Sequence, residues 1–216
     1  MAAVCVLFLI LIGEVVPPLV VFGLLFAGLA VGARRSPARW VRWLGAAMVV
    51  ALLALFSSFA VQDLAHPETP ASFGPTWLLV VAAVATVVLA VAAVRGGAVR
   101  PRTVWVVAGT ALVAGIAFTA VQGAGVQADA AQPGDVAVEA VDATYPAHIE
   151  VPVGHAVLVR NLDPIRHTFV VDGGVEPHEV PGSTDRRVEI DLPPGEYRYF
   201  CDVPGHEAMT GTLIVS

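Results

Sequence analysis

Lysine is absent from this sequence of 216 residues, and charged residues of any kind are scarce. Charged residues make up 14% of the chain, whereas 56% is hydrophobic and the mean hydropathy is +0.75. A soluble globular domain is usually about 25% charged, and disordered chains have a low hydrophobic content. The composition therefore excludes an ordinary soluble protein and a disordered one. The lack of Lys beside abundant Ala and Val favours a bacterial source with a GC-rich genome.

Cysteine is also rare, and the two cysteines stand at opposite ends of the chain. Cys5 lies in an apolar run, where we interpret it as a small apolar filler. We expect no disulfide between Cys5 and Cys201, so a small fold stapled by disulfides is excluded. Cys201 is left as a free thiol.

The few charges are unevenly distributed. Residues 1–126 carry seven Arg against three acids, a net charge of +4, and residues 127–216 carry five Arg against fifteen acids, a net charge of −10. Two different kinds of structure therefore share the chain. We place the boundary at about residue 128, with a transmembrane region over 1–128 and an exported domain over 129–216.

Four apolar segments in the first part are long enough to cross a membrane, which takes about 20 residues in a helix. We predict transmembrane helices over about 15–33, 43–62, 77–94 and 104–126. The last three contain no charged residue. Contact with membrane lipid follows from this prediction.

The start of the first span is set by polar and helix-breaking residues. Residues 1–33 form one apolar run, interrupted by Glu14 and by Pro17-Pro18. Proline is tolerated in the first turn of a helix, so a span from about 15 leaves residues 1–13 as a short apolar arm at the membrane surface. Glu14 has two interpretations, a functional residue inside an apolar run or a side chain that reaches water at the interface.

Arginine placement predicts the orientation of the spans. All seven arginines of the first part lie in the loops 34–42 and 95–103, and the loop 63–76 contains none. Because basic loops stay in the cytoplasm, we expect a multi-pass protein of the cell membrane with its C-terminal domain outside. The fourth span could alternatively be a signal sequence cleaved near Ala128, which would release that domain.

The C-terminal part shows short alternating runs separated by turn residues, which predicts an all-β sandwich. We expect antiparallel strands over 136–141, 148–152, 155–160, 167–171, 186–191, 196–200 and 211–215.

Metal-ligating residues gather near the C-terminus. The segment YFCDVPGHEAMTGT over 199–212 places Cys201, His206 and Met209 on one loop, and His167 opens an earlier strand. Two imidazoles, one thiolate and one thioether form a soft, mixed donor set. A trigonal His₂Cys site with a weak axial Met is the arrangement of electron-transfer copper sites.

Other interpretations of this cluster are weaker. Cys and His also suit Zn²⁺, but the thioether of Met209 is a poor zinc ligand. A small sandwich with a free cysteine and incidental His and Met residues would require four matching positions by chance. For the ligands to converge the loop must curl, and Pro204-Gly205 supplies a bend.

Residues 136–216 resemble the cupredoxins, the plastocyanin- and azurin-like blue copper proteins. The matching stretches are TYPAHIEVPVG at 144–154, VLVRNLDPIRHTF at 157–169, PPGEYRYFC at 193–201 and CDVPGHEAM at 201–209. The resemblance implies a Greek-key β-sandwich that holds one type 1 copper ion. By resemblance, His167, Cys201 and His206 are the equatorial ligands and Met209 is the axial ligand.

The resemblance carries further implications. Thr168 matches the position that links the two ligand loops, and we expect it to hydrogen-bond to the Cys201 sulfur. The short gap between His206 and Met209 also occurs in binuclear copper sites. Those sites need cysteines at positions that here hold Arg198 and Asp202, so a binuclear centre is excluded.

Together these features predict a membrane-anchored blue copper protein that carries single electrons. We expect no enzymatic activity, because four protein ligands leave no open position on the metal. By resemblance, His206 with Pro204, Ala208 and Met209 around it forms the docking patch for a redox partner such as a cytochrome or oxidase. The acidic charge either keeps the domain soluble or steers a basic partner, and it argues against nucleic-acid binding. The alternative function is copper storage, delivery or sensing.

Overall fold

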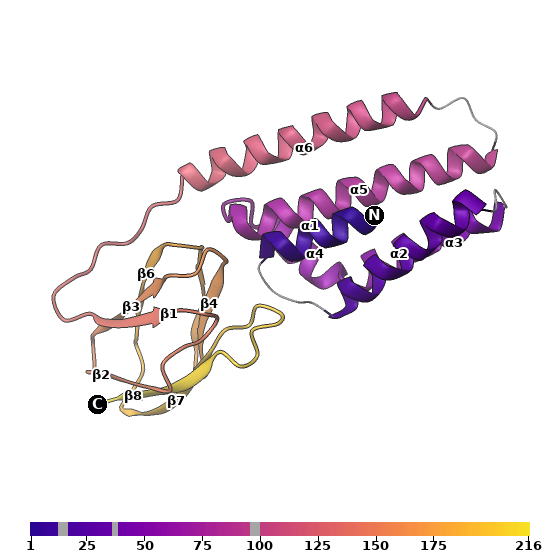
Figure 1. Cartoon of the computed structure of the whole chain (residues 1–216). Coiled ribbons are helices and arrows are strands. Elements are labelled where there is room, and N and C mark those ends of the chain that lie inside the picture. The colour runs from indigo at the N-terminus through magenta and orange to yellow at the C-terminus, as the bar shows by residue number, and fades with distance from the viewer. Residues whose placement is uncertain (13–16, 36–38, 96–99) are drawn as a thin grey trace. The chain divides into compact units, whose positions relative to one another are not determined.

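The computed structural model describes residues 1–12, 17–35, 39–95 and 100–216 of the chain (Figure 1). These residues form two compact units, Met1–Val121 and Gln122–Ser216. The first unit is helical and the second consists mainly of β-strands. The predicted order, a helical region followed by an all-β sandwich, is confirmed.

The helical unit is built from apolar helices. Their bounds are α1 Ala2–Ile12, α2 Pro17–Arg35, α3 Arg39–Leu55, α4 Ser57–Ala65, α5 Pro70–Arg95 and α6 Pro101–Ala124. A small core of Cys5, Leu19, Val49 and Leu52 holds α1, α2 and α3 together with α5. The segment predicted as an apolar arm is thus helical over most of its length. Glu14 lies outside the described residues.

Two helices within the described ranges are clearly long and apolar enough to cross a membrane, Pro70–Ala93 and Arg102–Ala124. A third span results if α3 and α4 are counted as one, and the apolar helix Pro17–Gly32 is shorter than a full span. These helices correspond to the four predicted spans. They fit a membrane-anchored protein.

The second predicted span, 43–62, is not one straight helix. Trp43–Leu55 and Ser57–Ala65 meet at an angle of 64°. At the break, the Ser57 hydroxyl donates a hydrogen bond of 2.9 Å to the carbonyl of Ala54. A serine that bonds back to the preceding turn in this way competes with the helical hydrogen bonds and bends helices.

The loop predicted over 63–76 is shorter than expected. Helix α4 continues through Asp63 to Ala65, and α5 begins at Pro70 and contains Pro75. Proline suits the first helical position because its missing N–H would have no partner there. Pro70 and Pro75 therefore lie at and near the start of a long helix.

The β domain consists of two packed sheets. The strands are β1 Val136–Ala140, β2 His148–Val151, β3 Ala156–Asn161, β4 His167–Val171, β5 Val175–Val180, β6 Asp185–Glu189, β7 Gly195–Phe200 and β8 Thr210–Val215. One sheet has the order β1-β3-β6, and the other has the order β2-β8-β7-β4-β5. The seven predicted strands are all present within one or two residues of their predicted ends.

Two features of the sheets differ from the sequence prediction. Strand β5, which has the sequence VEPHEV with Pro177 at its centre, pairs with β4 and was not among the predicted strands. β5 is an edge strand, where proline is tolerated. The sheets are also mixed, because β1 pairs with β3 and β2 pairs with β8 in parallel. Parallel neighbours are never joined by a tight hairpin, so the spacing of turns does not reveal them.

The core of the β domain lies between the sheets and reaches the predicted metal ligands. Tyr145, Phe169 and Tyr199 pack against one another, with ring centroids 5.3–6.0 Å apart. Cys201 and Met209 belong to the same buried cluster. The loop that carries the predicted ligands is therefore anchored to the core through Cys201 and Met209.

Candidate metal centre

Two neighbouring strands bring the predicted ligands together. His167 is the first residue of β4, and Cys201 directly follows β7. The two strands pair antiparallel, with Val170 opposite Phe200. Antiparallel pairing places the start of one strand beside the end of the other, so His167 and Cys201 lie side by side although they are 34 positions apart in the sequence.

The loop after β7 curls back and delivers His206 to the same place. Gly205 has φ of +90°, a left-handed conformation that glycine adopts at little cost. The N–H of His206 bonds to the carbonyl of Val203 at 3.0 Å, and the N–H of Cys201 bonds to the carbonyl of Met209 at 2.9 Å. The predicted bend at Pro204-Gly205 is therefore present.

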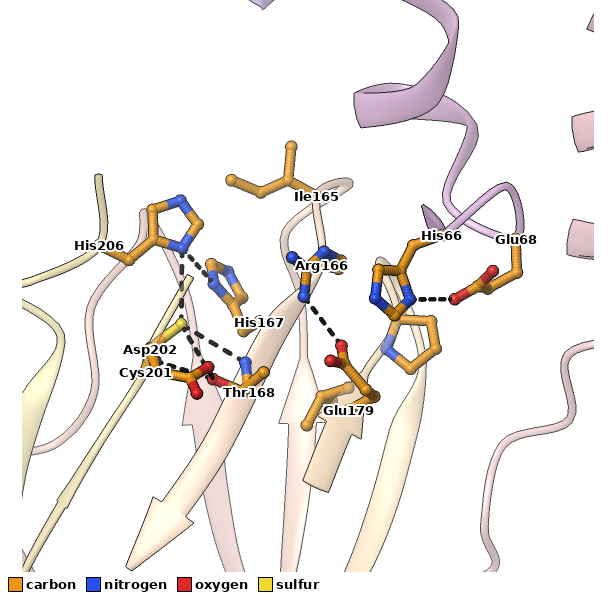
Figure 2. Close-up of polar contacts among 12 residues, drawn as sticks. His66, Glu68, Ile165, Arg166, His167, Thr168, Glu179, Cys201, Asp202 and His206 are labelled. Carbon is orange, nitrogen blue, oxygen red and sulfur yellow. Dashed lines mark hydrogen bonds and ion pairs between the residues drawn. The ribbon is translucent and has the colours of Figure 1, made fainter. Parts of the chain in front are cut away.

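The ligand atoms of His167, Cys201 and His206 all lie within 4.8 Å of one another. Figure 2 shows both imidazoles and the sulfur turned toward a common point. The two Nδ1 atoms are 3.1 Å apart, and the Cys201 sulfur lies 3.6 Å from Nδ1 of His206. His167 and Cys201 are buried, and His206 is partly exposed.

Met209, the fourth predicted ligand, immediately precedes β8. Its side chain is completely buried and belongs to the hydrophobic core of the domain. It therefore contributes nothing to the surface around His206, and its expected place in a docking patch is wrong. Its role as axial ligand stays a prediction.

Thr168 connects the two ligand loops as expected. Its N–H donates to the Cys201 sulfur at 3.4 Å, and its hydroxyl lies 3.6 Å from the same sulfur (Figure 2). The hydroxyl also donates to the Asp202 carboxylate at 2.7 Å and accepts from the Asp202 N–H at 2.9 Å. Hydrogen bonds to a thiolate stabilise its negative charge, so this arrangement suits a cysteine that binds metal as the thiolate.

Asp163 lies in the matched stretch 157–169, yet no role was predicted for it. Its carboxylate lies 2.8 Å from Nε2 of His167, the nitrogen that faces away from the site. It also accepts N–H bonds from Asp142 at 2.8 Å and Ala143 at 2.9 Å. The available signal was the spacing of an acid four residues before a predicted ligand histidine in the segment NLDPIRH.

Two further polar side chains fix the backbone around His167. The amide of Asn161 donates to the carbonyls of Ile165, Val180 and Pro181 over 2.8–3.1 Å. The Tyr145 hydroxyl donates to the carbonyl of Thr168 at 2.8 Å. The backbone on both sides of His167 is therefore held by buried hydrogen bonds, which favours a preformed site.

Both histidines of the site are neutral at pH 7. Burial, together with the nearby His167, lowers the pKa of His206 to about 4. Burial also lowers the pKa of His167, although its hydrogen bond to Asp163 opposes the shift. Burial raises the pKa of Asp163, but the hydrogen bonds from Ala143, His167 and Asp142 lower it by more, so the carboxylate is ionised. Neutral imidazoles are the form that metal ions bind.

The remaining histidines of the β domain lie outside this cluster. His148 and His155 are exposed. His178 is partly buried on β5 opposite Phe169.

The donor set defines the class of site. Two neutral imidazoles and a buried cysteine sulfur that accepts hydrogen bonds form a soft, mainly nitrogen and sulfur environment, with a buried thioether nearby. Such a set suits copper and lacks the oxygen ligands preferred by hard cations. A β-sandwich with this His, Cys, His and Met arrangement fits a type 1 copper site.

Comparison with known proteins agrees with this class. Residues 109–215 match the family described as "Cupredoxin-like domain". A search of curated proteins found no match.

Several solved structures are similar to part of the chain. A copper-containing nitrite reductase from Thermus scotoductus SA-01 shares 30% identity over 42% of this chain and 24% of its own length, with a TM-score of 0.32. The chain thus spans about a quarter of that enzyme. A reduced form of an amicyanin mutant shares 20% identity over 40% of this chain and 86% of its own, with a TM-score of 0.34. Auracyanin B shares 19% identity over 42% and 94%, with a TM-score of 0.33.

Proposed function

We propose that this protein is a membrane-anchored blue copper protein that carries single electrons between redox partners. The observation that carries the proposal is the convergence of His167, Cys201 and His206, with the sulfur held by the Thr168 N–H at 3.4 Å. With Met209 as axial ligand, these residues would hold one type 1 copper ion. Bound copper would supply a one-electron couple between Cu(I) and Cu(II).

The surrounding protein suits that role because it resists rearrangement. His167 sits on a strand, and Asn161 and Tyr145 hold the neighbouring backbone through buried hydrogen bonds. Cys201 is tied to Met209 and to Thr168. A site whose ligands keep their positions loses little energy to reorganisation when the charge of the metal changes.

His206 is the ligand through which we expect electrons to pass. It is partly exposed, whereas His167, Cys201 and Met209 are buried. Exposed Ala208 and partly exposed Pro204 lie on the same loop. The net charge of −10 over residues 127–216 would favour encounter with a basic redox protein such as a cytochrome.

The anchor and the placement of the domain belong to the same proposal. We infer that residues 1–128 span the cell membrane several times and that residues 129–216 lie outside the cytoplasm. The support is the apolar helices α5 and α6 together with the confinement of the first seven arginines to two short stretches, 34–42 and 95–103, at helix ends and between helices. Membrane lipid is then a permanent partner of the helical unit.

We further propose that the protein is a carrier and not an enzyme. Four protein ligands leave a metal ion no open position for a substrate. The buried position of three of the four ligands also argues against copper storage or delivery, since release of the ion needs ligands that can reach an acceptor.

The experiment uses the full chain in detergent, loaded with Cu(II). We expect an intense visible absorption and a narrow copper hyperfine splitting in the EPR spectrum, both reversible on reduction. Cys201→Ser should abolish the colour, and Cys5→Ser, its matched control, should keep it. A colourless Cu(II) protein that passes its copper to a chelator or an acceptor protein would instead establish copper handling.

A further inference from the structure

We propose that Asp163 is a positioning residue of the copper centre, which holds the His167 imidazole with Nε2 protonated and Nδ1 facing Cys201 and His206. The inference rests on the proposed function, because it assigns the copper-binding nitrogen of His167. Asp163 lies in the stretch matched at 157–169, but the resemblance gave it no role.

The hydrogen-bond chemistry of the two groups determines the tautomer. An ionised carboxylate can only accept hydrogen bonds, so the contact of 2.8 Å between Asp163 and His167 places the proton on Nε2. The lone pair of the neutral ring is then on Nδ1, which lies 3.1 Å from Nδ1 of His206. Since His167 is completely buried, water does not compete for either nitrogen.

Asp163 is itself held on several sides. Its two carboxylate oxygens accept the N–H groups of Asp142 and Ala143. Its own N–H donates to the side chain of Asn161 at 3.0 Å, and its carbonyl accepts the N–H of Ser183 at 2.8 Å. The carboxylate therefore has little freedom to rotate, and it fixes the orientation of the His167 imidazole.

The same carboxylate connects the ligand to a strained turn. Asp142 and Ala143 lie between β1 and β2 with φ of +51° and +50°, a left-handed conformation that costs about 1–2 kcal/mol for a residue with a Cβ atom. This conformation directs both N–H groups toward Asp163. One buried charge thus stabilises the turn and orients the metal ligand.

The charge of Asp163 has an expected effect on the metal. A carboxylate bonded to the far nitrogen of a ligand histidine raises the basicity of the ring, and loss of such a partner typically lowers metal affinity 10–100-fold. A more basic imidazole favours Cu(II) over Cu(I). If Asp163→Asn weakens Cu(II) binding tenfold more than Cu(I) binding, the reduction potential rises by about 59 mV for one electron.

The test begins with the metal-free full chain in detergent. ¹⁵N-histidine NMR at pH 7 should show His167 as the Nε2–H tautomer, with its signal assigned by its loss in His167→Gln. In Asp163→Asn this tautomer should lose its dominance. A wild-type His167 protonated on Nδ1 overturns the proposal, and this readout does not require copper.

The copper-loaded chain supplies the second readout. Asp163→Asn should bind Cu(II) 10–100-fold more weakly and show a raised potential. The matched control is Asp135→Asn, since the Asp135 carboxylate is also buried and accepts the N–H of Gln132 and the guanidinium of Arg187. The control should lose stability but keep the potential.

The outcomes separate the two proposals. A wild-type chain that never turns blue contradicts the proposed function, while the tautomer of metal-free His167 still decides the role of Asp163. A blue wild-type chain whose affinity and potential are unchanged in a folded Asp163→Asn variant overturns the positioning role and leaves the proposed function intact.

Discussion

The N–H of Thr168 donates a hydrogen bond to the sulfur of Cys201 across 3.4 Å, while the Thr168 hydroxyl exchanges two hydrogen bonds with Asp202. Thr168, which follows the predicted ligand His167, thereby holds both Cys201 and the neighbouring Asp202. This contact joins β4 to the loop after β7, which carries the other ligands.

Thr168→Val removes the hydroxyl and keeps the backbone N–H. We expect the free energy of unfolding of the metal-free β domain to fall by about 1–3 kcal/mol, because the Asp202 N–H loses its partner. The one hydroxyl proton is shared between Asp202 at 2.7 Å and the sulfur at 3.6 Å, so its loss leaves the sulfur with the backbone N–H alone and should also lower the reduction potential. Denaturation can be followed by the near-UV signal of tyrosine, because Tyr145, Tyr197 and Tyr199 all lie in this domain.

The matched control for this variant is Thr144→Val. The Thr144 hydroxyl donates to the carbonyl of Val141 at an exposed turn, so its loss should cost less and leave the potential unchanged. A Thr168→Val protein with the potential of the wild type would show that the hydroxyl does not act on the sulfur.

Met209→Leu tests the axial ligand. A swap of nearly equal volume in a core usually costs less than about 1.5 kcal/mol, so the variant should fold. If the thioether binds copper, its loss should raise the potential while the blue colour persists, because a weak axial bond favours Cu(II). Voltammetry measures the shift. Leu213→Met, at another fully buried position of the same core, should change neither property, and an unchanged potential in Met209→Leu would remove Met209 from the ligand set.

The stability of the metal-free domain should depend on pH through His206. Its pKa is lowered from 6.5 to about 4 in the folded chain, so between these values the unfolded chain binds more protons. The free energy of unfolding therefore falls as the pH drops from about 6.5 to about 4. Urea denaturation at a series of pH values should show this slope, and His206→Gln should reduce it. An equal slope in both proteins would contradict the assignment, whereas His148→Gln, at an exposed position, serves as control.

The contact between α5 and α6 depends on Gly115. A Cβ atom at Gly115 would overlap the Trp77 ring, whereas a Cβ atom at Gly109 would meet nothing within 4 Å. The Trp77 indole also donates to the carbonyl of Ala111 at 3.0 Å. We expect Gly115→Val to shift the tryptophan fluorescence and lower the melting temperature of the helical unit in detergent. Gly109→Val, on the same helix, should do neither, and equal behaviour of the two variants would argue against this packing.

The amino-acid sequence by itself determined the class of each half of this protein. Uncharged apolar segments of about 20 residues predict helices for a membrane, because length and hydropathy are local properties. Alternating runs between turns predicted seven of the strands. The spacing of Cys201, His206 and Met209 on one loop, with the His-Thr-Phe segment beginning at His167, was enough to predict a copper-binding set.

Only the tertiary structure decided which strands pair and which residues surround the ligands. The edge strand β5 and the parallel pairs arise from contacts between distant segments, which leave no periodic trace. The break at Phe56, where the Ser57 hydroxyl of α4 bonds back to the Ala54 carbonyl of α3, follows from no hydropathy pattern. Asp163 shares no motif with Asp142 or Ala143, and it meets their N–H groups because β1 and β3 lie side by side in one sheet. No sequence pattern marks a side chain such as Asp163 as the partner of a ligand. The folded structure shows it, because there Asp163 contacts His167.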